Sequence, residues 1–570
     1  MVNRPPDAVI PVALYLLAAT VVLVRIGEHP AFPYNWESYT AWHYVQSWAG
    51  PDRSAADIFS LTDGLMTDSG RGPLVGLPVW FGFSLDQVGL AAMRWPVALV
   101  AALAAPLIWA VGRRLVPEAA AVLAALLLVV SPVFLLYGRT ATLVGISLVP
   151  ALLTMLMLVR VLESSDRWRA TAQLGGLQAC LIASAYAYAP VRLLWPLTVA
   201  VLLIAAISWR QRRRFLLLAA VLTMTTVPAA LVAIDWLTIA AWDPWVTIAG
   251  YFRARGEHVF AFGDAPDRLL PYLRQAPAEP TETWRLALGL LAQNAGDLLR
   301  LLADWQTEPV VTNHWSPRGG LWSWVVAPFF WLGLGCLVFT AIRGRSWRSW
   351  LLLFLLLGLT MPLLFTTRVH VGRLVLVLPL LLLVVSEGWA LAGDGLGRLA
   401  GGRWPVLPKA MIRRVLPVGL AAILVLASAV MTIAGYAHTP ATRQEARQLE
   451  RIAAAVDQAT AHGGAAVIAP AAFGLEIEGV RAGTYWLALH DAYRVIDLTN
   501  VVPGSAGADR RPPLYVVGVL PRLLAGELPN ACRNLYLVLP EAEPEFREAL
   551  SQPRVQRQCP DGLRFDVLPV

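Results

Sequence analysis

Long runs of apolar residues, separated by short polar stretches, are the feature that most constrains this chain. Four of the longest are Val97–Val111, Ala119–Val130, Leu216–Ile234 and Leu374–Val385. With its flanks, each run approaches the roughly 20 residues that a helix needs to cross a bilayer. Helices are expected because the bilayer interior leaves backbone polar groups no water to bind. Hydrophobic residues make up 57% of the chain and charged residues 15%, which is typical of a polytopic membrane protein.

Charge clusters and Gly/Pro positions mark the ends of the spans. They predict eleven transmembrane helices, at about 8–25, 88–112, 117–136, 141–160, 172–189, 191–208, 215–234, 320–342, 347–365, 373–392 and 415–436. Arginine clusters fall in alternate loops, which the positive-inside rule assigns to the cytoplasm. The N-terminus is then cytoplasmic, while the loops 26–87 and 235–319 and the tail from 437 are extracytoplasmic. This topology accounts for the net charge of +8, so nucleic acid is not an expected partner.

Outside the spans, two loop segments and the tail carry patterns of their own. The short apolar segment Pro73–Phe83 predicts an interfacial helix. The segment Trp284–Trp305 predicts an amphipathic helix with Leu286, Leu288, Leu291, Leu298 and Leu302 on one side. The tail predicts an amphipathic helix at Ala441–Ala461, strands at Ala465–Ile468, Val495–Leu498, Leu514–Val519 and Leu535–Leu539, and helices at about 521–527 and 541–550.

These patterns give a mainly α fold. Residues 1–436 are expected to form a polytopic transmembrane helical bundle, and residues 437–570 a small extracytoplasmic α/β domain. The four cysteines have no metal-ligand spacing. Cys180 and Cys336 fall in apolar runs, where small core residues are expected, and Cys532 and Cys559 could form a disulfide if the tail is exported.

The first external loop carries carboxylates that spanning a bilayer does not require. Glu37 precedes Tyr39 by two residues in a Trp/Tyr-rich stretch, where partial desolvation would suit a general base. The alternative is an ordinary solvated loop glutamate. Asp63 and Asp68 could bind a divalent ion or a sugar hydroxyl, although Asp-Gly and Asp-Ser also form ordinary turns.

Several cations lie on the outer side, against the inward bias of the other arginines. They are Arg71, Arg139, Arg192 (after Tyr188), His370 and Arg373. A lipid phosphate would explain them, since the arginine fork binds phosphate with two hydrogen bonds; an internal salt bridge would explain them equally well. His314 lies in a further polar cluster and could bind metal, although a lone histidine is more often a structural donor.

The order of these motifs resembles the GT-C membrane glycosyltransferases related to protein O-mannosyltransferases and aminoarabinose transferases, a group found in bacteria. The resemblance rests on short motifs along residues 8–436: Asn35-Trp36-Glu37-Ser38-Tyr39, Gly70-Arg71-Gly72-Pro73, Ser131-Pro132 with Tyr137-Gly138-Arg139, Tyr186-Ala187-Tyr188 with Arg192, Asn313-His314, and His370 with Arg373. The family has an Asp-Glu pair in the first loop. This chain has Trp36 at the Asp position and matches the Glu at Glu37.

The resemblance implies sugar transfer on the outer face of the bacterial plasma membrane. The donor would be a polyprenyl-phosphate-linked monosaccharide, the acceptor a lipid, glycan or protein, and the anomeric carbon would be inverted. A divalent metal ion is not fixed by the sequence. Two other functions stay open: a relative without catalytic activity that binds or transports a polyprenyl-linked glycan, and an assembly protein whose exported tail recruits partners.

Overall fold

The computed structural model describes part of the chain, from which every structural statement below is drawn. The described residues are 8–27, 37, 73–85, 89–164, 166–187, 189–208, 218–222, 292–302, 322, 325–344, 346–364, 374–403, 409–437, 465–468, 494–497, 513–516, 535–537 and 565–567. The chain divides into two compact units. One comprises Met1–Val24, Ser54–Leu77 and Trp95–Thr439, and the other Arg25–Arg53, Pro78–Arg94 and Pro440–Val570.

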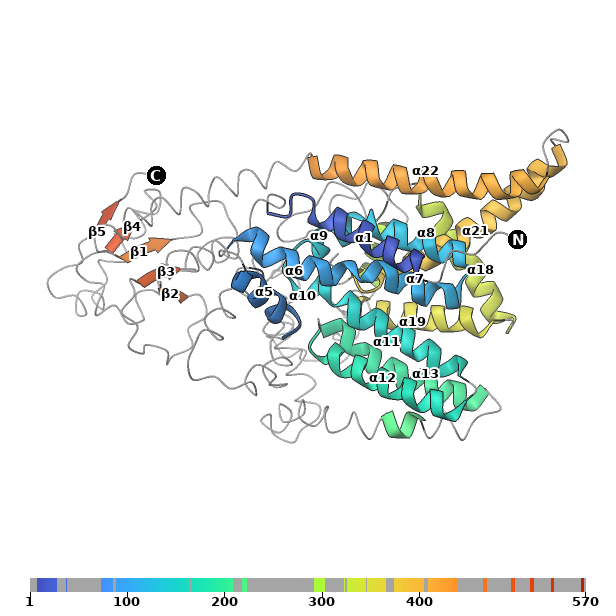
Figure 1. Ribbon diagram of the computed structural model, residues 1–570, viewed down its shortest axis with the longest axis horizontal. Coiled ribbons are helices and arrows are strands. Elements are labelled where there is room, and N and C mark those ends of the chain that lie inside the picture. The colour runs from blue at the N-terminus through green and yellow to red at the C-terminus, as the bar shows by residue number, and fades with distance from the viewer. Residues whose placement is uncertain are drawn as a thin grey trace, which may run out of the picture. The chain divides into compact units, whose positions relative to one another are not determined.

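Helices make up nearly all of the described residues before 440 (Figure 1). They are α1 (Val9–Leu23), α5 (Pro73–Leu85), α6 (Leu90–Ala102), α7 (Ala104–Leu115), α8 (Glu118–Val129), α9 (Pro132–Gly138), α10 (Leu143–Ile146), α11 (Leu148–Glu163), α12 (Arg167–Ala185), the 3₁₀ turn η1 (Ala189–Leu193), α13 (Leu194–Ser208), α18 (Ala327–Ile342), α19 (Trp347–Leu364), α21 (Leu378–Arg403) and α22 (Lys409–Ala437). The mainly helical architecture predicted from the sequence is confirmed.

Four of the described helical stretches are long and apolar enough to cross a membrane. They are Leu90–Leu115, Leu143–Glu163, Leu378–Leu396 and Val415–Ala434, and counting each of two bent helix pairs as one span raises the number to six. A multi-pass membrane protein is therefore supported. The predicted count of eleven stays a prediction, because segments such as 215–234 lie almost entirely outside the described residues.

One predicted span is broken. The sequence predicted a single helix over 117–136, but α8 ends at Val129 and α9 starts at Pro132, with a bend of 61°. Proline lacks the N–H that would continue the helix, so it is favoured at the start of a new one. The Ser131 hydroxyl caps that new helix by accepting a hydrogen bond from the Phe134 backbone N–H, 3.5 Å away.

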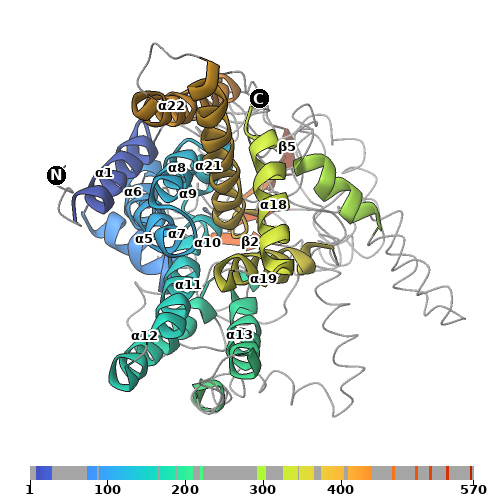
Figure 2. The same ribbon diagram turned by 90° about the vertical axis from the view of Figure 1, so that its right-hand side faces the viewer.

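Among the described helices, α18 and α21 share the most extensive contact, and they lie side by side in Figure 2. Gly333 of α18 and Gly388 of α21 face each other where the helices cross. A Cβ at Gly333 would overlap the carbonyl oxygen of Val384, and one at Gly388 would overlap that of Phe329. Small residues let transmembrane backbones approach and gain packing energy that lipid cannot supply.

We expect Gly333→Ala to destabilise the protein by about 1–3 kcal/mol, because the added methyl group must push two packed backbones apart. Gly335→Ala is the matched control: it lies on the same helix, and a Cβ there meets nothing within 4 Å. The measurement is the free energy of unfolding in mixed micelles of detergent and denaturing surfactant. Equal effects of the two substitutions would mean that the crossing does not depend on Gly333.

Part of the loop 235–319 forms a helix at residues 292–302, within the segment predicted to be amphipathic. Its Leu298, Leu301 and Leu302 are buried, which confirms the pattern for the two of them that were predicted. The Asn294 side-chain amide donates to the carbonyl of Leu364, the last residue of α19, at 2.9 Å. This bond gives a partner to one of the carbonyls that a helix end leaves without one.

The tail contains a five-stranded parallel sheet, drawn in orange to red in Figure 1. The strands are β1 (Ala465–Ile468), β2 (Arg494–Asp497), β3 (Pro513–Val516), β4 (Leu535–Leu537) and β5 (Phe565–Val567), in the order β2-β3-β1-β4-β5. Four of them overlap the predicted strands, and β5 was not predicted. Parallel strands need long crossover connections, which are usually helical. The predicted helices at 521–527 and 541–550 lie outside the described residues, so the α/β domain stays a prediction.

Candidate functional site

Three of the predicted site residues belong to the part of the chain that the structure describes: Glu37, Arg139 and Arg192. The other predicted site residues lie outside it: Tyr39, Asp63, Asp68, Arg71, Tyr188, His314, His370 and Arg373. Their placement and roles stay predictions. The site is therefore built from Glu37 and the residues that contact it, and from the surroundings of the two arginines.

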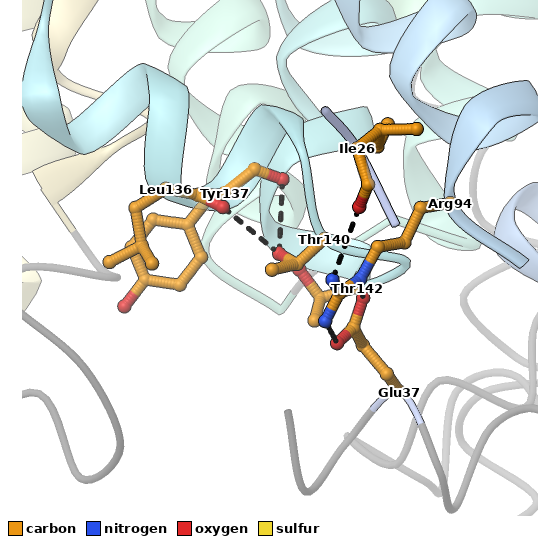
Figure 3. A network of polar contacts seen from close by, with 7 residues as sticks. All are labelled: Ile26, Glu37, Arg94, Leu136, Tyr137, Thr140 and Thr142. Carbon is orange, nitrogen blue, oxygen red and sulfur yellow. Dashed lines mark hydrogen bonds and ion pairs between the residues drawn. The ribbon is translucent and has the colours of Figure 1, made fainter. Parts of the chain in front are cut away.

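Glu37 is fully buried and paired with an arginine from α6. Arg94 donates from Nε to Oε1 of Glu37 at 2.9 Å and from Nη2 to Oε2 at 2.8 Å (Figure 3). Both side chains have an exposed fraction of 0%. Two parallel charge-assisted hydrogen bonds are the strongest arrangement that an arginine and a carboxylate can form. The sequence predicted a partly desolvated carboxylate, and the structure describes one that is completely buried and held in place.

The same arginine also binds the turn that follows α1. Arg94 Nη1 donates to the carbonyl of Ile26 at 3.3 Å. Arg25, just before it, has a φ of 52°, in the left-handed region that often ends helices and that is costly for a residue with a side chain. Gly27 passes close to Ala91 of α6, where an added Cβ would lie 3.2 Å from the Ala91 Cβ. The guanidinium of Arg94 thus connects Glu37 to this turn.

Arg94 was missed in the sequence, although a signal for it exists. It lies six residues inside the predicted span 88–112, surrounded by apolar residues. An arginine inside a membrane helix is costly unless it is paired, so its presence there predicts an acidic partner. The first external loop supplies that partner. Among the residues that the structure describes, Glu37 is the one acidic side chain that is buried.

Arg139 is nearly buried and contacts the end of α1. Its guanidinium donates to the carbonyl of Val21 at 3.3 Å and to that of Val24 at 2.6 Å. The last carbonyls of a helix lack partners within the helix and carry partial negative charge, which a cation stabilises. The sequence left a lipid phosphate and an internal salt bridge open for this arginine. The described contacts are of a third kind, to main-chain carbonyls.

The stretch around Arg139 is a buried turn between α9 and α10. Thr140 donates to the carbonyl of Leu136 at 3.2 Å, and its hydroxyl lies 3.3 Å from that of Thr142 (Figure 3). Irregular backbone at membrane depth is tolerated where it is buried in protein, and these hydroxyls help to satisfy it. Gly145 is required for this turn, because a Cβ there would overlap the carbonyl of Tyr137.

Arg192 lies half-buried in η1, between α12 and α13. Its place directly before α13 agrees with the predicted position at a helix start, and its location on the outer side stays a prediction. Its use as a phosphate ligand stays a prediction.

Within the described residues, no three His, Cys, Asp or Glu side chains come together to hold a metal ion. The predicted candidates for metal binding, Asp63, Asp68 and His314, lie outside the described residues. Cys180 and Cys336 are free thiols, while Cys532 and Cys559 are outside the described residues.

Comparison with known proteins shows similarity to one family over part of the chain, and a fold. Residues 70–236 match the family model of the dolichyl-phosphate-mannose-protein mannosyltransferases, a segment that includes Arg94, Arg139 and Arg192. The curated proteins contain no match to the chain.

Among solved structures, apo ArnT from Cupriavidus metallidurans aligns with a TM-score of 0.50 at 14% identity, over 89% of this chain and 86% of ArnT. The apo oligosaccharyltransferase of Archaeoglobus fulgidus aligns with a TM-score of 0.47 at 13% identity, over 84% of this chain and 63% of that protein. ArnT bound to undecaprenyl phosphate aligns with a TM-score of 0.42 at 15% identity, over 78% and 80%. The chain thus has the GT-C membrane glycosyltransferase fold predicted from its sequence, with residues 70–236 similar to the dolichyl-phosphate-mannose-protein mannosyltransferases.

Proposed function

We propose that the protein transfers a monosaccharide from a polyprenyl-phosphate donor to an acceptor on the extracytoplasmic face of the bacterial plasma membrane. The observation that carries the proposal is Glu37, a fully buried carboxylate in the first external loop of a GT-C fold. ArnT, which has this fold, has been solved with undecaprenyl phosphate bound, and this supports a lipid-linked donor. A polyprenyl phosphate is also a suitable leaving group because it needs no nucleotide outside the cytoplasm.

In the proposed reaction, Glu37 accepts the proton of an acceptor hydroxyl. The oxygen attacks the anomeric carbon from the face opposite the phosphate, and the bond between that carbon and the phosphate oxygen breaks, so that the configuration inverts. The phosphate leaves with the electron pair. Outward-facing arginines, with Arg71, Arg192 and Arg373 as the candidates, stabilise its developing charge.

The ion pair with Arg94 fits this role because it fixes the direction of both Glu37 oxygens. A base acts only within hydrogen-bond reach of the proton it removes, so a fixed orientation favours transfer. Arg94 is then a positioning residue, since it acts on the substrate through Glu37.

A second function, binding or transport of a polyprenyl-linked glycan without transfer, is favoured by one observation. Both oxygens of Glu37 already accept hydrogen bonds from Arg94, and the family's aspartate is replaced by Trp36. An acceptor hydroxyl would have to compete with Arg94 for these two oxygens. Asp63 or Asp68 could supply the missing carboxylate if either reaches the site.

The test is sugar release by the purified full-length protein from a panel of radiolabelled polyprenyl-phosphate monosaccharides in a bilayer. We expect release from at least one donor, and more of it when an acceptor-containing membrane extract is added. Donor binding without any release would contradict the enzymatic proposal and support the second function. Absence of both binding and release across the panel would contradict both.

A further inference from the structure

Three helix ends meet at a second cluster of charged residues. Arg114 lies in the last turn of α7, Glu163 is the last residue of α11, and Arg348 lies in the first turn of α19. Arg114 Nη1 donates to Oε2 of Glu163, and Arg348 Nη2 lies 3.8 Å from Oε1 of the same carboxylate. One carboxylate therefore faces two guanidinium groups, and the positive charge is not balanced within the network.

Further arginines flank this network. Arg113 precedes Arg114, Arg160 lies one turn before Glu163 on α11, and Arg343 caps the end of α18, a short turn away from α19. We use the name arginine cluster for Arg113, Arg114 and Arg348. Within the described residues the Nε of Arg114 is buried and makes no hydrogen bond. The cluster thus has both excess charge and an unused donor.

The depth of the arginine cluster is set by the helices that carry it. Two of the candidate membrane spans end beside the cluster. Leu90–Leu115 ends one residue after Arg114, and Leu143–Glu163 ends at the carboxylate that Arg114 and Arg348 face. Aromatic side chains lie at the same level: Arg113 is 4.4 Å above the Trp109 ring and Arg348 is 5.8 Å from the Trp347 ring. Tryptophan concentrates at the boundary between membrane and water, where phospholipid headgroups lie.

We propose that the arginine cluster binds the phosphate of an anionic phospholipid in the leaflet where these helices end. A phosphodiester would supply the negative charge that Glu163 cannot provide for both guanidinium groups. Arginine presents several N–H donors in a fixed plane, which matches phosphate oxygens. Basic groups between transmembrane helices at headgroup level are a recurring site for acidic lipids. The lipid is favoured over free phosphate because the cluster borders apolar spans and the partly exposed Trp347, which acyl chains can contact.

The test uses the purified full-length protein in nonionic detergent, titrated with phosphatidylglycerol or with phosphatidylcholine and followed by native mass spectrometry. We expect phosphatidylglycerol to bind at least about 10-fold more tightly. Arg113→Gln should lower that affinity about 5-fold, and Arg113→Gln with Arg348→Gln roughly 25-fold, on the basis of the usual contribution of each basic residue. Arg113 is suited to this because its described contact is with Trp109 on its own helix, so its loss leaves the ion pairs intact.

The matched control is Arg169→Gln, which changes an arginine whose side chain is 82% exposed and outside the cluster. Its affinity for phosphatidylglycerol should equal that of the unmodified protein. Inorganic phosphate at the same concentration should not displace the lipid. Equal affinity for the two lipids, or an affinity that Arg113→Gln leaves unchanged, would overturn the proposal. Displacement by inorganic phosphate would assign the cluster to a free anion and overturn it as a lipid site.

Discussion

Glu37→Gln is expected to lower the rate of sugar transfer at least about 100-fold, because glutamine has the same shape as glutamate but cannot accept the acceptor's proton. Loss of a positioned general base typically costs this factor or more. Donor binding should change little, since the donor phosphate is proposed to contact arginines. The measurement is initial rate and donor affinity with the polyprenyl-phosphate sugar that the wild-type protein accepts.

The substitution also removes a charge that faces Arg94, so folding must be checked. Thermal unfolding and size-exclusion profiles of the variant separate a lost base from a lost fold. Glu37→Asp keeps the charge but withdraws the carboxylate by one methylene, and we expect an intermediate rate if position matters. Full transfer by folded Glu37→Gln would exclude Glu37 as the base.

Much of the membrane part could be predicted because its determinants are local. Apolar run length and the cost of an unsatisfied backbone specify helices, and most described helices overlap the predicted spans. The break in the span 117–136 depends on local chemistry too, at Ser131 and Pro132, but hydrophobicity alone conceals it. The crossing at Gly333 and Gly388 could not be predicted, because it joins residues 55 positions apart whose pairing depends on how the helices pack.

Only one residue of the buried ion pair, Glu37, could be predicted from the sequence as part of the candidate site. The polar loop identified Glu37, since crossing a bilayer does not by itself require a carboxylate in a loop between two spans. Its partner Arg94 lies 57 residues further along the chain, inside an apolar run. The hydrophobicity of that run predicts a membrane span and gives no separate signal for the arginine within it. For Arg139, its place in the topology left a lipid phosphate and an internal salt bridge open as partners. Its described contacts are with the carbonyls of Val21 and Val24, which depend on how α1 ends.

Arg94→Met is expected to destabilise the protein by about 3–5 kcal/mol, because it leaves the carboxylate of Glu37 buried without its charged partner. The turn at Ile26 also loses a hydrogen bond. The double variant Arg94→Met with Glu37→Met should recover most of that loss, since two apolar side chains can fill the space that the ion pair occupies. The measurement is the free energy of unfolding in mixed micelles for the wild-type protein, both single variants and the double variant.

This cycle separates the two roles of the pair. A coupling energy of several kcal/mol between Arg94 and Glu37 would mean that each residue needs the other in order to be buried. Arg169→Met, at a largely exposed arginine, should change stability little and serves as the control for lost charge. If the double variant is stable but makes no product, the pair is dispensable for folding and is kept for transfer. A double variant as unstable as Arg94→Met alone would instead mean that the hydrogen bond to Ile26 and the bulk of the guanidinium, rather than charge neutralisation, hold this part of the chain together.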